Sequence, residues 1–128
     1  MNVGDAITPL ERRLDLVDLV AYAGATWDWH RLHYDPAFLV TKNLDKAVVD
    51  GQELAAFMAE QVMDHFGPRA FPAKMSFRFS SMVFAGDTVT VTGEVTAVDG
   101  GEVTVAQKVL VGERLCAHGE TTVRLRKA

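Results

Sequence analysis

The alternation of apolar and polar residues in the second half of the chain constrains its fold more than any other feature. Apolar residues recur at alternate positions along four stretches, which are Met75–Phe79, Val89–Val95, Val103–Val111 and Leu115–Leu125. Alternation with many β-branched residues is typical of strands that bury one face. Turn sequences separate the stretches at Ala85-Gly86-Asp87, Asp99-Gly100-Gly101 and Gly112-Glu113. The pattern therefore predicts four strands in an antiparallel meander joined by short turns.

One long amphipathic helix is predicted over residues 50–67. Its apolar residues, spaced three, four and one apart, are Leu54, Phe57, Met58, Val62 and Phe66. Asp50 is the predicted N-cap, and Glu53 three residues later completes a variant of the capping box. Gly67-Pro68 ends the helix. The free N–H groups predicted at Gly51 and Gln52 would offer partial positive charge to an oxyanion, and a glycine there lets a substrate approach the backbone closely.

The predicted helix is the available cover for one face of the predicted sheet. A sheet with one apolar face requires such a cover, which gives an α+β class with a curved antiparallel sheet wrapped around a central helix. The 128 residues suit one domain with a substantial core, and the sequence contains no repeat, linker or low-complexity segment. We therefore expect a single domain over residues 1–128.

A shorter helix is predicted before the central one, over Asp15–Ala23. Its apolar residues follow helical spacing, Asp18 is the predicted N-cap and Gly24 the predicted end. A loop rich in acids and histidines then runs to Asp35-Pro36, a turn signal.

That loop, Thr26–Asp35, carries the candidate catalytic groups. Asp28, His30, His33 and Asp35 lie among bulky apolar residues. A carboxylate five residues before an imidazole can handle a water proton by general acid–base catalysis. Aromatic neighbours can exclude solvent and move both pKa values. Taken singly, Asp28 could cap a turn and His33 could be a satisfied core histidine.

Three motifs together resemble the MaoC-like branch of the hotdog fold, the (R)-specific enoyl-thioester hydratases and dehydratases. The family motif Asp-x-Asn-Pro-(Leu/Ile)-His-x-Asp corresponds to Asp28–Asp35. The resemblance continues through Val48-Val49-Asp50-Gly51 at the family's helix entry, and through the stretch that ends in Gly86-Asp87-Thr88. It covers most of the chain from about Asp15 onward.

The resemblance implies roles for particular residues. Asp28 and His33 match the catalytic acid and base, and the Gly51 N–H matches the group that holds the thioester oxygen. It also implies that no separate cofactor is needed, since CoA or acyl carrier protein arrives as part of the substrate. It implies at least a dimer, a homodimer or a heterodimer with another hotdog chain, that pairs exposed sheet edges.

The chain departs from the family pattern at three positions. His30 replaces the usual Asn, can still form a hydrogen bond and is expected to support the catalytic pair without acting directly. Arg31 replaces Pro and leaves the loop less restrained. Asp50 replaces the His that commonly precedes the glycine. A carboxylate there would oppose catalysis if it faced the oxyanion, and would be harmless if it capped the helix.

Composition excludes several other classes. The net charge of -4, without a basic run, argues against a nucleic-acid binder, and the single Cys116 excludes an internal disulfide. No group of His, Cys, Asp and Glu has convincing metal-binding spacing, so we expect no metal site. No apolar run is long enough to cross a membrane, and the first residues do not resemble a signal peptide, which predicts a cytoplasmic protein.

Three alternatives to a hydratase or dehydratase of acyl metabolism stay open. A non-catalytic subunit that binds an acyl chain and completes an active partner would bind without turnover. A thioesterase on the same fold would release free thiol, and the Asp/His motif argues against it. An interaction module would bind no acyl-CoA. Acyl length and any ring-bearing substrate cannot be derived from these residues.

Overall fold

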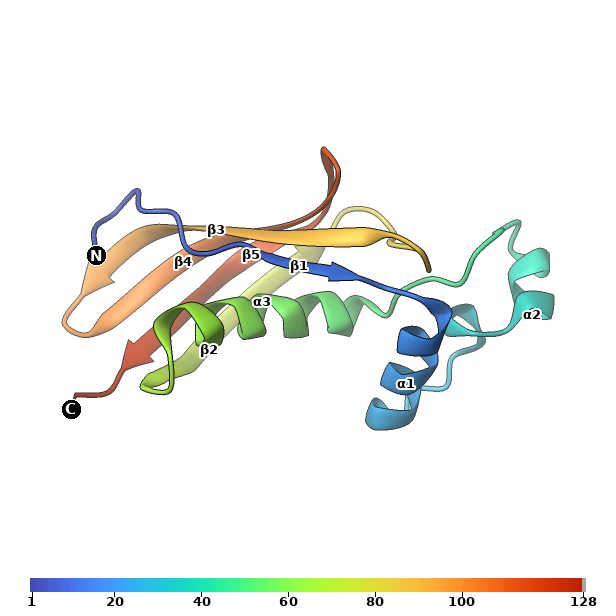
Figure 1. Cartoon of the computed structure of the whole chain (residues 1–128), viewed down its shortest axis with the longest axis horizontal. Helices are drawn as coiled ribbons and strands as arrows, with labels where there is room; N and C mark the ends of the chain where they lie inside the picture. The colour runs from blue at the N-terminus through green and yellow to red at the C-terminus, as the bar shows by residue number, and fades with distance from the viewer. Residues whose placement is uncertain (128) are drawn as a thin grey trace.

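A five-stranded antiparallel sheet forms the body of the protein in a computed structural model, which describes residues 1–127. Its strands are β1 (Leu10–Arg13), β2 (Ala70–Phe79), β3 (Thr88–Asp99), β4 (Glu102–Val111) and β5 (Arg114–Leu125). They lie in the order β1-β3-β4-β5-β2. The sheet curves over the helix α3 (Gly51–Phe66), which lies along its inner face (Figure 1). The predicted α+β architecture is confirmed.

The period-two pattern buries one face of this sheet as predicted. Val91 pairs with Val109 and Val103 with Val123, and all four side chains are buried. Leu54, Met58 and Val62 of the predicted helical stripe are also buried, whereas Phe57 and Phe66 are partly buried at its margin. The central helix and the apolar face of the sheet thus form the core, and burial of each such side chain contributes about 1.5–3 kcal/mol.

A buried polar network also fixes α3 to the sheet. The amide nitrogen of Gln107 donates to the Met58 carbonyl and to Gln61 Oε1, both at 2.8 Å. Thr121 donates to Gln107 Oε1 at 2.6 Å, and Gln61 in turn donates to the carbonyl of Val91 at 3.0 Å. Because each of these buried amides finds partners, the network specifies the position of the helix at little desolvation cost.

The prediction of a four-stranded meander is wrong for the first of its strands. β3, β4 and β5 do form a meander, but β2 pairs with β5, with Phe77 opposite Gly119. The segment of residues 80–87 therefore crosses from one side of the sheet to the other instead of forming a hairpin. β1, which no prediction included, pairs with β3 and leaves β2 at the opposite edge.

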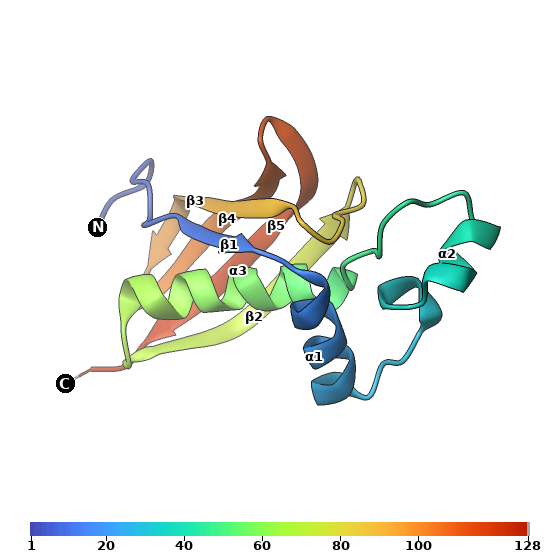
Figure 2. The same ribbon diagram turned by 45° about the vertical axis from the view of Figure 1, so that its right-hand side comes forward.

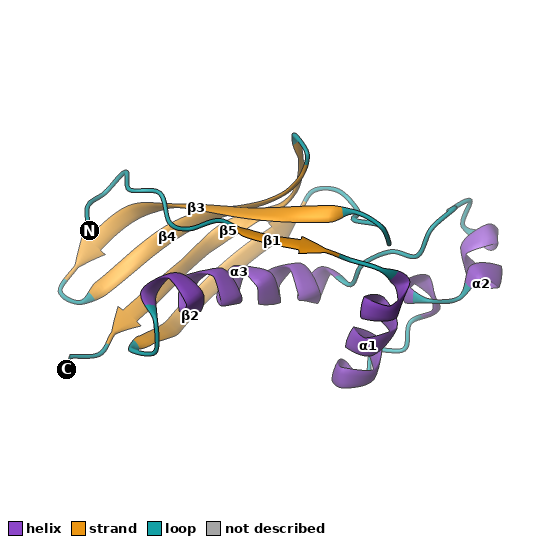
Figure 3. Ribbon diagram, in the orientation of Figure 1, coloured by secondary structure: helices purple, strands orange, loops and turns teal. Residues whose placement is uncertain are grey.

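Three short helical elements gather at one end of the sheet, away from both termini (Figures 1 and 2). They are α1 (Leu16–Thr26), the 3₁₀ turn η1 (Arg31–His33) and α2 (Pro36–Thr41). Figure 3 distinguishes this helical end from the strands. The sequence predicted α1, but α2 was not expected. Asp35, predicted only as a turn residue, is the N-cap of α2, and its Oδ1 accepts the Ala37 N–H at 3.0 Å.

Both predicted boundaries of α1 are wrong. Asp15 is the N-cap, and Asp18 at the third helical position accepts the Asp15 N–H at 2.8 Å in a capping box. The helix passes through Gly24 and ends only at Thr26, because Trp27 adopts a left-handed conformation with φ of 58°. A glycine is not required for that ending, although it is the usual residue.

Within residues 1–127, no helix combines the length and apolar character that crossing a membrane requires.

Candidate active site

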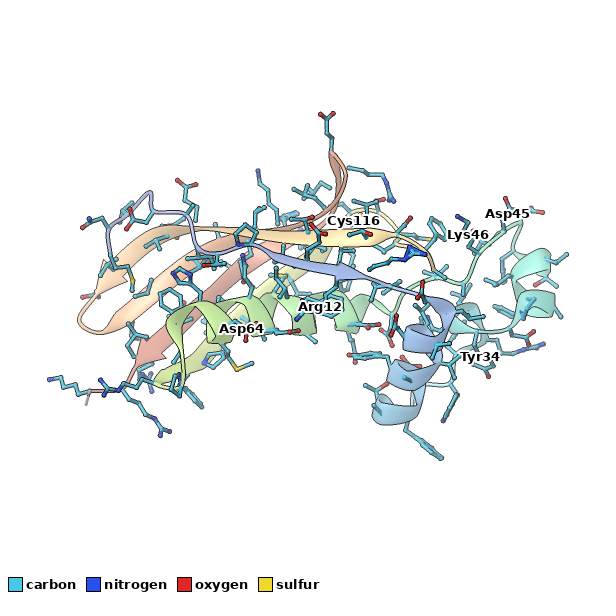
Figure 4. All side chains as sticks on the ribbon, viewed as in Figure 1. Arg12, Tyr34, Asp45, Lys46, Asp64 and Cys116 are labelled. Carbon is cyan, nitrogen blue, oxygen red and sulfur yellow. The ribbon has the colours of Figure 1, made fainter. Side chains whose placement is uncertain are left out.

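His33 is placed by the short turn η1, which begins at His30. The His30 Nδ1 accepts the Leu32 N–H at 3.1 Å and so caps the turn. His33 follows, and its Nδ1 lies 2.7 Å from the carbonyl oxygen of Val48. Only a protonated Nδ1 can form that bond, since a carbonyl oxygen can only accept. The Nε2 atom of His33 is therefore the one that exchanges protons. Figure 4 labels Tyr34, the next residue, at the α1/α2 end of the molecule.

Asp28 reaches His33 because α1 ends in the left-handed residue Trp27. The turn is closed by the Asp28 N–H, which donates to the carbonyl of Ala23 at 3.0 Å. The side chain of Asp28 then lies beside those of His33 and Asp50, with one donor or acceptor atom of each within 4.8 Å of the others. The predicted pair is thus brought together, and Asp50 is a third member.

Asp50 both caps α3 and faces the pair. Its Oδ1 accepts the Gln52 N–H at 3.0 Å, whereas its buried Oδ2 has no hydrogen-bond partner among the described residues and lies 3.8 Å from His33 Nε2. The capping role considered for this carboxylate is therefore confirmed, and its second oxygen faces His33. The prediction of a free N–H at Gln52 is wrong, because this N–H donates to Asp50 Oδ1.

Glu53 does not complete the predicted capping box. Its N–H bonds to the Asp50 carbonyl at 3.0 Å, but its side chain is buried and Oε2 has no hydrogen-bond partner among residues 1–127. Burial, followed by repulsion from Asp18 and Asp50, raises the pKa of Glu53 to about 7. This carboxyl therefore retains a proton at pH values where an exposed Glu has lost it.

The two aspartates shift in opposite directions. The neighbouring Asp50 carboxyl is the main cause that lowers the pKa of Asp28. Burial, followed by the neighbouring Asp28 carboxyl, raises the pKa of Asp50. Ionisation of Asp28 is therefore favoured over ionisation of Asp50 in this coupled pair.

Gly51, which directly follows Asp50, is one of the residues that line a cavity. As the first residue of α3 it has an N–H with no partner inside the helix. The cavity has a volume of about 330 Å³ and is lined mainly by apolar side chains, including those of Leu54 and Phe79, and by Ser80 and Ser81. A β-carbon at position 51 would lie 2.8 Å from Phe79 Cζ, so glycine is what leaves room for the ring.

The aromatic residues of the loop lie mainly at its surface. Trp27 is exposed, and its ring meets that of Trp29 edge to face with centroids 6.0 Å apart. Neither tryptophan lines the cavity at Gly51. His30 lies with its ring centroid 6.0 Å from that of His33, which suits a supporting position.

Comparison with known proteins identifies the family. The family model described as "MaoC like domain" matches residues 3–115. The chain belongs to the MaoC-like family. One chain in the structure of the ChsH1-ChsH2 complex from Mycobacterium tuberculosis matches with a TM-score of 0.92 and 27% identity. The match covers 98% of this chain and 99% of that one. The hotdog fold implied by the sequence motifs is therefore confirmed.

Two curated relatives of this MaoC-like chain match nearly its whole length. The (R)-specific enoyl-CoA hydratase of Aeromonas caviae is 31% identical over 120 residues, which are 91% of this chain and 90% of that protein. The 3-oxo-4,17-pregnadiene-20-carboxyl-CoA hydratase beta subunit of Mycobacterium tuberculosis is 32% identical over 123 residues. These residues are 96% of this chain and 94% of that protein.

Asp50 is the site residue that the sequence did not predict as a site member. Its position directly before Gly51 was the available signal, but its capping role offered a sufficient explanation for a carboxylate there. Only the approach of α3 to the loop, which is a long-range contact, places Oδ2 against His33.

Proposed function

We propose that this MaoC-like protein catalyses the (R)-specific hydration of 2-enoyl thioesters, or the reverse dehydration of 3-hydroxyacyl thioesters, with CoA as the favoured carrier. One observation carries the proposal: Asp28 and His33 converge with Asp50, which directly precedes Gly51, a residue that lines the cavity and whose N–H has no partner inside α3. Relatives along nearly the whole chain include an (R)-specific enoyl-CoA hydratase.

The proposed chemistry uses each of these groups. Water oxygen bonds to carbon 3 while its proton passes to the site, and the double-bond electrons move to the thioester oxygen. The Gly51 N–H stabilises that negative charge, and such a donor is typically worth about 3–4 kcal/mol of barrier. A proton from the site then bonds to carbon 2 as the electrons return, so the substrate gains one water.

The structure favours one division of labour between the pair. Asp28 is the carboxylate whose pKa is lowered, mainly by the neighbouring Asp50 carboxyl, so it takes the proton from water. His33 presents Nε2 to the site while Nδ1 bonds to Val48, so a protonated Nε2 supplies the proton to carbon 2. His30 supports the turn that carries His33.

The remaining expectations belong to this proposal. The reaction needs no separate cofactor and no metal, although Asp28, His33 and Asp50 are spaced closely enough to share an ion. The protein is a single domain of lipid or related acyl metabolism in the cytoplasm, and it acts as a homodimer or as a partner of another hotdog chain.

A second candidate is a non-catalytic subunit of a hetero-oligomeric hydratase. Two observations favour it: one relative is a beta subunit, and the similar ChsH1-ChsH2 structure is a complex of two named proteins. In this candidate the chain binds an acyl group and completes an active partner. The presence of both Asp28 and His33 favours the catalytic proposal over it.

The test follows a short and a long 2-enoyl-CoA by loss of the conjugated-thioester absorbance, with and without a chelator. The proposal predicts turnover that the chelator leaves unchanged, a product oxidised only by an (R)-specific 3-hydroxyacyl-CoA dehydrogenase, and no free thiol. Binding of acyl-CoA without turnover would favour the subunit candidate, and thiol release would establish a thioesterase. The absence of binding would indicate an interaction module.

A further inference from the structure

Hydration by two separate groups leaves the site in the wrong protonation state for the next turnover. In the proposed reaction Asp28 gains the proton from water and His33 loses the proton that reaches carbon 2. The substrate has gained a whole water, so no net proton has left the site. One proton must therefore pass from Asp28 to His33 before the next cycle.

Asp50 is the group that contacts both. Its Oδ2 lies 3.8 Å from His33 Nε2, and one of its oxygens lies within 4.8 Å of an Asp28 oxygen. Oδ2 is buried and has no hydrogen-bond partner within residues 1–127, so it is free to carry a proton between them. A gap of this length closes with a small rotation or with one bridging water, and catalytic hydrogen bonds are often long without substrate.

We propose that Asp50 is a positioning residue that returns a proton from Asp28 to His33 after each turnover. It accepts the proton of Asp28 on one oxygen and gives its own to His33 Nε2, which leaves Asp28 ionised and His33 cationic. This inference rests on the proposed hydration. It concerns a position where the family commonly has a histidine, which could also carry a proton.

The surroundings of Asp50 support proton retention. Tyr22 of α1 and Glu53 of α3 face the same cluster, and Asp18 acts on Glu53 from α1. The pKa of Asp50 is raised, first by burial and then by Asp28, although the Gln52 N–H and His33 act to lower it. The side chains of His33 and Asp50 are only 13% and 11% exposed, which limits direct exchange with bulk water.

Rapid mixing with a short 2-enoyl-CoA separates the first turnover from later ones and tests the relay. Asp50→Asn keeps an oxygen for the Gln52 N–H, so the cap on α3 survives while the proton carrier is lost. We expect this variant to convert one substrate per site at nearly the wild-type rate. Its steady-state rate should then fall by about tenfold to a hundredfold, with a larger solvent deuterium isotope effect.

Asp50→His is the matched variant, because imidazole can both cap the helix and carry a proton. It should restore most of the steady-state rate. Equal first and later turnovers in Asp50→Asn, at the wild-type rate, would overturn the relay. An equal loss in both phases would overturn it as well, since Asp50 would then act in the chemical step. Absence of turnover by the wild type would instead reject the proposed function on which the relay depends.

Discussion

Gly51 lines the cavity, and its N–H has no partner inside α3. An added methyl group would lie 2.8–3.2 Å from three ring atoms of Phe79, whose side chain is exposed enough to move. We expect Gly51→Ala to displace the ring into the cavity and to lower kcat/KM about tenfold or more, a loss of at least about 1.4 kcal/mol. The free energy of unfolding should change by less than about 1 kcal/mol.

Gly24→Ala is the control for that substitution. Gly24 lies inside α1, and an added β-carbon would make only ordinary contact with Trp29 at 3.5 Å. It should leave activity unchanged. Wild-type kcat/KM in Gly51→Ala would show that the amide is not used in the reaction.

The buried carboxyl of Glu53 gives the protein a defined pH dependence. Its pKa rises from 4.5 to about 7 on folding, mainly because of burial, so between these values the folded state holds a proton that the unfolded state has released. The free energy of unfolding therefore falls as pH rises through this window, by about 3 kcal/mol at most.

Glu53→Gln removes the ionisable carboxyl and with it this pH dependence of the free energy of unfolding. We expect its melting temperature to match the wild type near pH 5 and to exceed it at pH 8. Asp64→Asn, exposed on the same helix, should keep the wild-type pH dependence. Parallel wild-type and Glu53→Gln curves from pH 5 to 8 would contradict a buried, proton-retaining Glu53.

At the scale of elements, the contact between β2 and β5 depends on Gly119. A β-carbon there would lie 1.9 Å from the Ser76 carbonyl oxygen, and backbone atoms cannot yield as a side chain does. We expect Gly119→Ala to lower the free energy of unfolding by about 3 kcal/mol or more, measured by denaturant titration. Glu120→Ala, at the exposed neighbouring position, should have little effect. A similarly small change in the free energy of unfolding of both variants would contradict the close contact of β2 with β5 at Gly119.

The central helix was predictable because its signals are local. Asp50 and Gly67 bound α3 as the sequence indicates, and three residues of the predicted stripe are buried. β1 was missed because it has only four residues, and α2 because its six residues are too few for a periodic pattern. The pairing of β2 with β5 depends on contacts over some forty residues, which alternation alone does not specify.

The candidate site was predictable to a different extent. Asp28 and His33 lie five residues apart, so one loop brings them together, and the resemblance named both. The third member, Asp50, joins them only through the approach of α3 to that loop. The proton on His33 Nδ1 likewise depends on Val48, which lies 15 residues away in the chain.

At the scale of the whole molecule, β2 presents an unpaired strand edge. Phe71, Phe77 and Phe79 on this strand are 39–52% exposed, which is unusual for aromatic side chains on a free edge. We expect light scattering to give twice the chain mass of 14.0 kDa, and Phe77→Lys to shift the protein toward the monomer. Val98→Lys, exposed on β3, is the control. A monomeric wild type at micromolar concentration would indicate that the chain requires a different partner.

The central claim is that Asp28 and His33 act together on a 2-enoyl thioester, and the most direct test is the hydration rate of Asp28→Asn and His33→Ala beside the wild type. The account predicts that each substitution lowers kcat/KM by about a hundredfold or more while acyl-CoA binding and the melting temperature stay near wild-type values. Wild-type rates in either variant would contradict it. So would a folded wild type that binds 2-enoyl-CoA and leaves its double bond intact.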